Sequence, residues 1–233
     1  MEECNSCGNE YKNVTLHWVK SDCEKPDLSD YQKELITGIV MGDGSVANPN
    51  TADNPTLRVK MINEEFLSWL DSELGWLSNG YTLTQTAEEA AEENRRSGFS
   101  PNARAENYHD KYTLRTKGID ELNRWRDWYG ENGKVFPEDI NPTETVMKMW
   151  YVCDGALEKY NKTPHISISA NNERNNEDKI KSLFTEIGVS PVVNESTRSW
   201  SIRLSQEDSK KFFDYIGDPP DGFRRKWPDY YFE

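Results

Sequence analysis

The chain has 233 residues, of which 41 are acidic and 28 are basic, so its formal net charge at pH 7 is −13. No stretch approaches the roughly 18 consecutive apolar residues of a membrane-spanning helix, and no signal-peptide pattern opens the chain. We therefore exclude an integral membrane protein and expect a cytoplasmic one. The acid excess also argues against a protein whose whole surface binds nucleic acid.

The negative charge has two explanations that the sequence leaves open. A host with molar internal salt favours acidic, well-solvated surfaces, because salt screens charges over short distances and surface acids keep a protein soluble. A haloarchaeon or its virus is such a source, and we favour this explanation. The alternative is an acidic body that carries a locally basic face for an anionic partner.

The first 27 residues contain four candidate metal ligands, Cys4, Cys7, His17 and Cys23. Three thiolates and one imidazole are a suitable donor set for tetrahedral Zn²⁺, and so short a segment needs a bound metal in order to fold. We therefore predict a structural zinc module in residues 1–27. The alternative is a disordered leader with three reduced cysteines, since disulfides are rare inside cells.

An apolar phrase of ten residues that ends in Asp-Gly occurs twice, as Leu35–Gly44 and Val146–Gly155. Each phrase has the pattern of a buried helix. An acid at a helix C-terminus is unfavourable, because that end carries partial negative charge and unpaired carbonyls. One Asp-Gly alone is a common helix stop, but two matching copies predict two helices that pack together and bring Asp43 close to Asp154. Their mutual repulsion indicates a cation between them.

Local signals indicate where these two helices begin and where they touch. Ser29 and Gln32 form a capping-box pattern before the first helix, and Pro142 is predicted at the first position of the second. Each helix has small or adaptable residues one turn apart on one face, so the two backbones can approach closely. These residues are Gly38, Gly42, Met149 and Cys153.

The hydrophobic pattern predicts further elements in the same order after both phrases. Residues 45–48 are predicted as a turn. Period-two alternation indicates strands, and apolar stripes with helical spacing indicate helices. The predicted strands are 57–62, 80–84, 112–117, 165–170, 191–194 and 199–204, and the predicted helices are 64–74, 119–129, 177–187 and 206–216. We therefore expect an α+β protein with halves 28–139 and 140–233, each with the order αββαββα and an antiparallel sheet.

Residues 87–107 interrupt the first half and have no counterpart in the second. This acidic segment is highly charged and poor in large apolar residues, which predicts a mobile insertion. Its arginines, Arg95, Arg96 and Arg104, are weak candidates for contacts with a phosphate backbone.

The polar faces of the predicted strands carry Arg, Lys, His, Ser and Thr but no Asp or Glu. Any half-exposed antiparallel strand alternates in polarity, so the alternation alone indicates only a solvated face. The residue types indicate more, because Arg and Lys suit guanine edges in the major groove and hydroxyls suit several bases or phosphates. The candidate DNA-binding residues are Arg58, Lys60, Thr113, Arg115, Lys117, His165, Ser167, Ser169, Arg198, Ser201 and Arg203.

The repeated phrases Ile36–Gly44 and Met147–Gly155 resemble the two namesake motifs of the LAGLIDADG homing endonucleases, in the single-chain form that fuses two half-sites. Two lysine-and-proline phrases, Lys134–Pro137 and Arg225–Pro228, strengthen the resemblance, which covers residues 28–228. The sequence departs from the family in having one acid at each motif instead of two, and Arg in place of the usual Tyr at the start of the second lysine phrase.

The resemblance implies a monomer that hydrolyses both strands of a long, asymmetric double-stranded DNA site and leaves short 3′ overhangs. It also implies that the strands of each half form a saddle in the major groove. Asp43 and Asp154 would hold Mg²⁺, with backbone carbonyls such as those of Gly42 and Cys153 completing the coordination.

The resemblance further implies that Lys134 and Lys226 each assist cleavage of one strand. Without the flanking prolines, both lysines are equally well explained as solvated surface charges. Some relatives on the same fold act as intron RNA-splicing maturases or as DNA-binding regulators that do not cleave, and these are the alternative functions. Two retained acids argue against a regulator but not against a maturase.

Overall fold

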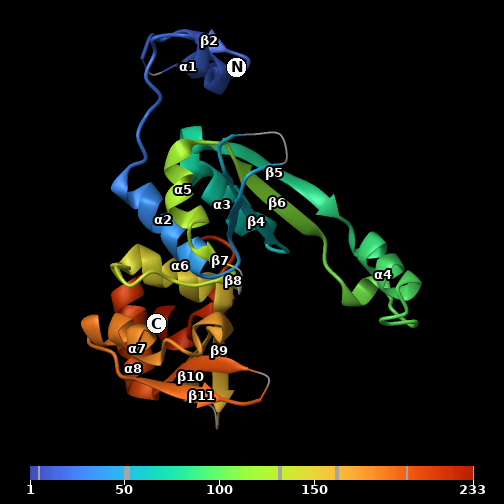
Figure 1. Ribbon diagram of the computed structural model, residues 1–233. Helices are drawn as coiled ribbons and strands as arrows, with labels where there is room; N and C mark the ends of the chain where they lie inside the picture. Colours follow the sequence, from blue (N-terminus) through green and yellow to red (C-terminus); the bar gives the residue numbers. More distant parts are fainter. Residues whose placement is uncertain (5, 50–52, 131–132, 161–162, 198, 233) are drawn as a thin grey trace.

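Two helices, α2 (Asp30–Met41) and α6 (Glu144–Asp154), pack side by side at the centre of the molecule and are called the motif helices below. Figure 1 shows one antiparallel sheet beside α2 and a second beside α6, so the predicted α+β fold is confirmed. The computed structural model describes residues 1–4, 6–49, 53–130, 133–160, 163–197 and 199–232. Within these residues, no helix is long and apolar enough to cross a membrane.

The order αββαββα occurs twice along the chain. The first set consists of α2, β3 (Ser45–Ala47), β4 (Thr56–Met61), α3 (Glu64–Leu74), β5 (Ser78–Gln85), β6 (Lys111–Thr116) and α5 (Asn123–Arg126). The second consists of α6, β9 (Gly155–Tyr160), β10 (Thr163–Ser169), α7 (Glu177–Glu186), β11 (Pro191–Glu195), β12 (Trp200–Leu204) and α8 (Gln206–Ile216). The strand orders of the two sheets, β3-β4-β6-β5 and β9-β10-β12-β11, correspond strand by strand.

Side-chain caps determine where the motif helices begin. The Ser29 hydroxyl accepts a hydrogen bond from the Gln32 amide, and the Gln32 side chain accepts one from the Ser29 amide, which confirms the predicted capping box. The prediction that Pro142 begins the second helix is wrong, because Thr143 is the N-cap of α6 and Glu144 is its first residue. A cap of this kind stabilises a helix by roughly 1 kcal/mol.

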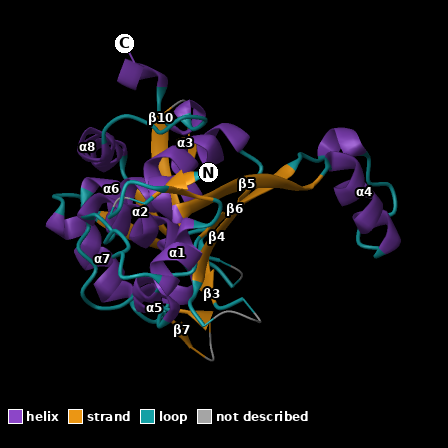
Figure 2. Ribbon diagram, turned by 90° about the horizontal axis from the view of Figure 1, so that it is seen from above, coloured by secondary structure: helices purple, strands orange, loops and turns teal. Residues whose placement is uncertain are grey.

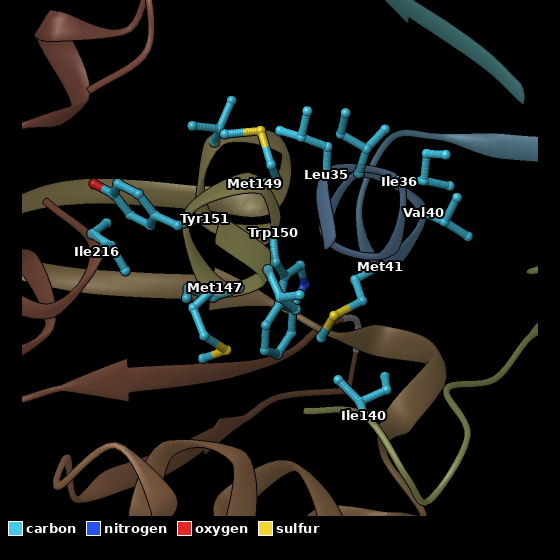
Figure 3. Close-up of a cluster of buried hydrophobic side chains, with 14 of the residues drawn as sticks. Leu35, Ile36, Val40, Met41, Ile140, Met147, Met149, Trp150, Tyr151 and Ile216 are labelled. Carbon is cyan, nitrogen blue, oxygen red and sulfur yellow. The ribbon is translucent and has the colours of Figure 1, made fainter. Parts of the chain in front are cut away.

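The core forms where the motif helices meet the inner faces of the sheets. Leu35, Ile36, Met147 and Trp150 are completely buried around the helix pair (Figure 3). Alternate side chains of β4, β10 and β12, such as Leu57 in β4, join the same continuous cluster. Because each fully buried aliphatic side chain contributes about 1.5–3 kcal/mol, this cluster holds the two sheets rigidly on the helix pair.

Three predicted segments differ in the structure. Residues 45–47, within the predicted turn, form β3, and β9 was not predicted at all. β3 has only three residues, too few for a period-two signal, and the sequence of β9, Gly-Ala-Leu-Glu-Lys-Tyr, does not alternate between apolar and polar residues. The predicted helix 119–129 is a 3₁₀ turn (Asp120–Leu122) followed by the four-residue α5. There the Asn123 side chain donates to the Asp120 carbonyl, which competes with regular helical bonding.

The insertion that the sequence predicts to be mobile contains a helix, α4 (Ala87–Arg96), and a 3₁₀ turn (Ala105–Asn107). Figure 2 shows this segment at the far end of a long arm formed by β5 and β6. Thr86 and Glu89 form a capping box at its start, and its Ala, Glu and Arg residues are strong helix formers. Local propensity therefore explains a helix that buries few large side chains.

The N-terminal module consists of β1 (Glu2–Glu3), β2 (Glu10–Tyr11) and α1 (Val14–Lys20). It packs against the first sheet region in two places. The ring of Trp18 meets that of Trp76 edge-on, with centroids 5.6 Å apart. Glu2 forms an ion pair of 2.7 Å with Lys117, which is almost completely buried.

Candidate functional site

The two acids of the repeated phrase stand at the same end of the motif helices. Asp43 follows Gly42, the C-cap of α2, and Asp154 is the last residue of α6. The backbones approach closely here because Gly42 has no side chain. A Cβ atom at Gly42 would lie 2.2 Å from the Cβ of Cys153 and 3.4 Å from a carboxylate oxygen of Asp154.

Gly38 permits the same close approach one turn earlier. A Cβ atom there would lie 2.6 Å from the Cβ of Met149 and 2.4 Å from the carbonyl oxygen of Val146. The predicted contact of small and adaptable residues between the two helices is therefore confirmed. Because tightly packed helices cannot shift independently, this contact also fixes the positions of the two acids relative to each other.

Both carboxyl groups ionise less readily than a free aspartate. Burial, with a smaller contribution from the charge of Asp43, raises the pKa of Asp154 to about 6. Burial also raises the pKa of Asp43. The ammonium groups of Lys134 and Lys226 oppose both shifts but do not cancel them. Carboxylates in this situation favour a bound cation.

The two predicted lysines bind the C-terminal ends of the motif helices. The Lys134 ammonium donates to the Gly42 carbonyl at 2.6 Å. The Lys226 ammonium donates to the carbonyls of Val152 and Gly155, both at 2.7 Å. Burial lowers the pKa of each lysine. They are therefore not solvated surface charges, and they offset the partial negative charge of the helix ends.

A cavity lies on each side of the helix ends. The larger, about 460 Å³, is lined by Asp43 and by four basic residues, Lys60, Lys111, Arg225 and Lys226. The smaller, about 250 Å³, is lined by residues that include Asp154, Lys134 and Glu173. Asp43, in the first half of the chain, thus shares a cavity with Lys226, near the end of the second half. Asp154, in the second half, shares a cavity with Lys134, near the end of the first half.

The oxygen atoms at the helix ends fit a hard divalent cation such as Mg²⁺, which prefers carboxylate, carbonyl and water ligands. Two carboxyl groups with raised pKa values would supply the charge. The Gly42 carbonyl already accepts a hydrogen bond from Lys134, so as a metal ligand it would have to use its second lone pair. The Cys153 thiol does not compete, because burial raises its pKa to about 12 and keeps it protonated.

The polar face of the first sheet presents Arg58, Lys60 and Arg115 to solvent, as predicted. Arg58 and Arg115 are cross-strand partners, and like charges placed opposite each other favour an anion that they can share. Lys111 belongs to the same face and was missed, because the predicted strand began one residue too late. Its period-two spacing from Thr113 is the signal that identifies it.

Two predicted residues of this face are not available to DNA. Thr113 is 3% exposed, and its hydroxyl lies 3.1 Å from that of Thr84. Lys117 lies beyond the end of β6, where it donates to the Trp76 carbonyl and pairs with Glu2. The prediction of an open strand face is wrong for both residues, because neighbouring elements cover their side chains.

The second sheet differs because β9 adds an acid to its polar face. Glu158 forms an ion pair of 2.5 Å with Arg203. The polar faces of the predicted strands carry no acid, but this unpredicted strand places one beside them. Four further predicted residues are partly exposed in this sheet, His165, Ser167, Ser169 and Ser201. Arg198, also predicted to bind DNA, lies outside the described residues.

The four predicted ligands of the N-terminal module converge. The sulfur atoms of Cys4, Cys7 and Cys23 and a ring nitrogen of His17 all lie within 4.8 Å of one another. Thiolates bound at about 2.3 Å to a tetrahedral Zn²⁺ stand about 3.8 Å apart, so the cluster has the size of such a site. Hydrogen bonding, chiefly from the Asn9 backbone amide, lowers the pKa of Cys7 to about 6, which favours the thiolate that binds metal.

Comparison with solved structures finds the same fold in one homing endonuclease and a weaker similarity in two further proteins. The homing endonuclease I-WcaI bound to its DNA recognition sequence is 13% identical, with a TM-score of 0.70 over 91% of this chain and 90% of that one. I-DmoI in complex with DNA and Mn is 14% identical, with a TM-score of 0.47 over 78% and 94%. The N-terminal LAGLIDADG domain of DUF199/WhiA is 10% identical, with a TM-score of 0.46 over 80% and 82%.

Sequence comparison identifies the family directly. No curated protein matches the chain. A family model described as the LAGLIDADG DNA endonuclease family matches residues 33–212, which include both sheets, all of α6 and all of α2 except its first three residues. The chain therefore belongs to the LAGLIDADG DNA endonuclease family.

Proposed function

We propose that this protein is a monomeric, Mg²⁺-dependent homing endonuclease that cuts both strands of a long, asymmetric DNA site. The observation that carries the proposal is the pair of carboxyl groups, Asp43 and Asp154, at the ends of two closely packed helices. Acids at helix C-termini are unfavourable, and burial raises the pKa of both. In a purely structural contact between helices these two acids would only cost stability, whereas in a divalent-ion centre they would bind the metal.

In the proposed reaction, water attacks a phosphodiester of each strand. Mg²⁺ bound by Asp43 and Asp154 would supply a Lewis acid that activates this water and neutralises the leaving oxygen. Lys226 in the larger cavity and Lys134 in the smaller one would each hold a proton near the phosphate of one strand. Because burial lowers their pKa values, these ammonium groups give up a proton more readily than free lysines.

The exposed polar faces of the two sheets would bind the DNA. The first sheet offers Arg58, Lys60, Lys111 and Arg115 for guanine edges or phosphates. The second offers chiefly hydroxyls, because Arg203 is paired with an acid. Two faces that differ in this way suit an asymmetric site. In the halophilic cytoplasm that we also propose, counterion release would add little affinity, so contacts with base edges would dominate.

The N-terminal module would bind one structural Zn²⁺, because three thiols and one imidazole converge there. We expect purified protein to contain about one zinc per chain by elemental analysis, as one four-ligand site requires. Cys4→Ser and Cys23→Ser should lose the metal and lower the melting temperature. Cys153→Ser, which changes a cysteine outside the cluster, should retain it. Retention of zinc by both cluster variants would contradict the assignment.

The decisive experiment is to sequence the cleavage products of a randomised duplex library incubated with the protein and Mg²⁺ in high KCl. An endonuclease should return one long, asymmetric site with short 3′ overhangs. The alternative functions, an intron RNA-splicing maturase or a non-cleaving DNA-binding regulator, predict no cut duplex. A parallel RNA-splicing assay and a DNA-binding assay on the same library would then distinguish those two.

A further inference from the structure

The loops that carry the two lysines are each fastened to the opposite half of the molecule. Lys134 precedes α6, yet Phe136, two residues after it, contacts the turn between β10 and α7 and the first turn of α7 itself. Lys226 lies near the end of the chain, yet the residues before it contact the start of α3. Because the position of a lysine on a loop depends on the position of the loop, these contacts decide where the two ammonium groups lie.

Glu173 fastens the Lys134 loop. Its carboxylate, in a residue that is 1% exposed, accepts a hydrogen bond from the Phe136 amide at 2.7 Å. The same carboxylate pairs with Lys179 at 2.8 Å, and Lys179 donates to the Phe136 carbonyl at 2.7 Å. One buried ion pair therefore holds both backbone groups of Phe136, two residues after Lys134.

Asn63 fastens the Lys226 loop. Its side-chain oxygen caps α3, and its side-chain amide donates to the Gly222 carbonyl at 2.8 Å. Gly222 has a φ of +78°, and a Cβ atom there would lie 2.3 Å from the Asn63 side-chain oxygen, so only glycine fits. The neighbouring Phe223 packs edge-on against Phe66 of α3, with ring centroids 5.0 Å apart.

We propose that Glu173 and Asn63 are positioning residues, one for each cleavage centre, an inference that rests on the proposed endonuclease function. Neither residue bonds Lys134 or Lys226 directly, and each acts through the loop that carries one of these two lysines. Each also lines the cavity of the lysine that it positions. The two contacts differ in chemistry. Glu173 acts through a buried ion pair that makes two hydrogen bonds to the backbone, whereas Asn63 acts through a single hydrogen bond from its neutral side-chain amide.

The test compares strand-resolved cleavage by the full-length, metal-loaded protein on a cognate duplex labelled on one strand at a time. Lys134→Met and Lys226→Met first assign one strand to each lysine. Glu173→Gln should slow the Lys134 strand about 10- to 100-fold and change the other by less than about threefold. Asn63→Asp should do the reverse, because it keeps the capping oxygen but places an acceptor against the Gly222 carbonyl.

A matched control and a second variant separate positioning from general damage. Glu177→Gln removes an exposed carboxylate that pairs with Lys181 on α7, and it should slow neither strand. Lys179→Met removes the other contact with Phe136, and it should slow the same strand as Glu173→Gln. All variants are compared in one buffer, at a temperature at which thermal melting shows each of them to be folded.

Hydrogen exchange provides a second readout that needs no cleavage. Glu173→Gln should speed amide exchange in residues 133–140 and leave residues 217–227 unchanged, and Asn63→Asp should do the opposite. A wild-type protein that cuts no duplex would refute the endonuclease, while exchange would still decide whether the residues position these loops. Equal slowing of both strands, slowing of neither strand, or unchanged exchange in both loops would overturn the inference.

Discussion

The cavities beside the two motif helices occupy matching places in the two halves but differ in charge. The larger places Asp43 among four basic residues, whereas the smaller places Asp154 and Glu173 with Lys134. A phosphodiester is an anion, so the larger cavity attracts it more strongly. The burial that raises the pKa of both acids is common to the two sites.

The sheets beside these cavities differ in the same direction. Among the described residues, Arg58 and Arg115 of the first sheet have no ion-pair partner, whereas Arg203 of the second is paired with Glu158. The repeated order of elements thus fixes where the side chains stand, while the individual residues decide what charge each sheet presents. We therefore expect the two halves to contribute unequally to binding and to cleavage.

The largest expected effect comes from removing either acid. Asp43→Asn and Asp154→Asn should each lower double-strand cleavage at least about 100-fold, because each removes a charged ligand of the proposed metal centre. DNA binding should survive, since the sheets are unchanged. Plasmid linearisation and gel-shift titration measure the two properties. If each half cuts one strand, the residual nicks left by Asp43→Asn should lie on the opposite strand from those left by Asp154→Asn. Full cleavage by either variant would refute the assignment.

A second substitution tests the helix contact that the two halves share. Gly42→Ala should lower the free energy of unfolding by about 1–3 kcal/mol, because the added Cβ atom meets that of Cys153. Adding Cys153→Gly should recover part of the loss by moving the small residue to the other helix. Gly130→Ala, where a Cβ atom meets nothing within 4 Å, is the control. Urea unfolding that shows no difference between Gly42→Ala and wild type would contradict the close contact.

The pH dependence of stability should report the raised pKa of Asp154. Because burial raises the pKa of Asp154 from 3.8 to about 6, the folded protein binds this proton more tightly than the unfolded chain. Stability from this group is therefore fully present below about pH 4 and is lost as pH rises through 6, by about 1–2 kcal/mol after allowance for its partial exposure. We expect Asp154→Asn to remove this loss in metal-free protein, measured as the difference from wild type across pH 4–7. An unchanged profile would contradict the shifted pKa.

The smallest effects should come from single charges on the two sheets, and they should have opposite signs. Arg58→Gln should reduce the slope of log affinity against log salt by about 0.9, if Arg58 contacts one phosphate. Glu158→Gln should steepen it by up to the same amount, because it frees Arg203. Binding titrations in a KCl series measure both slopes. A shallower slope for Glu158→Gln would show that Arg203 does not face the DNA.

Much of the fold follows from local patterns. The motif helices, α3, α7 and α8 have apolar stripes long enough to be recognised, and the Ser29 capping box has a distinct pattern. The strand β3 was missed because it is short, and β9 was missed because its sequence does not alternate in polarity. The helix α4 was missed because it rests on local propensity without large buried side chains. Thr113 and Lys117 were predicted to be exposed but are buried, because residues distant in the sequence cover their side chains.

Local patterns were enough to predict that two acids would end two packed helices, because the apolar phrase, the Asp-Gly and the small residues one turn apart are all local in each copy. Local spacing likewise identified the four candidate cysteine and histidine ligands that converge at the N-terminus. In contrast, the sharing of one cavity by each acid and a particular lysine depends on tertiary contacts. So do the contacts through which Glu173 and Asn63 hold the lysine loops. These contacts join residues 37 and 159 positions apart, and no periodicity along the chain encodes such pairings.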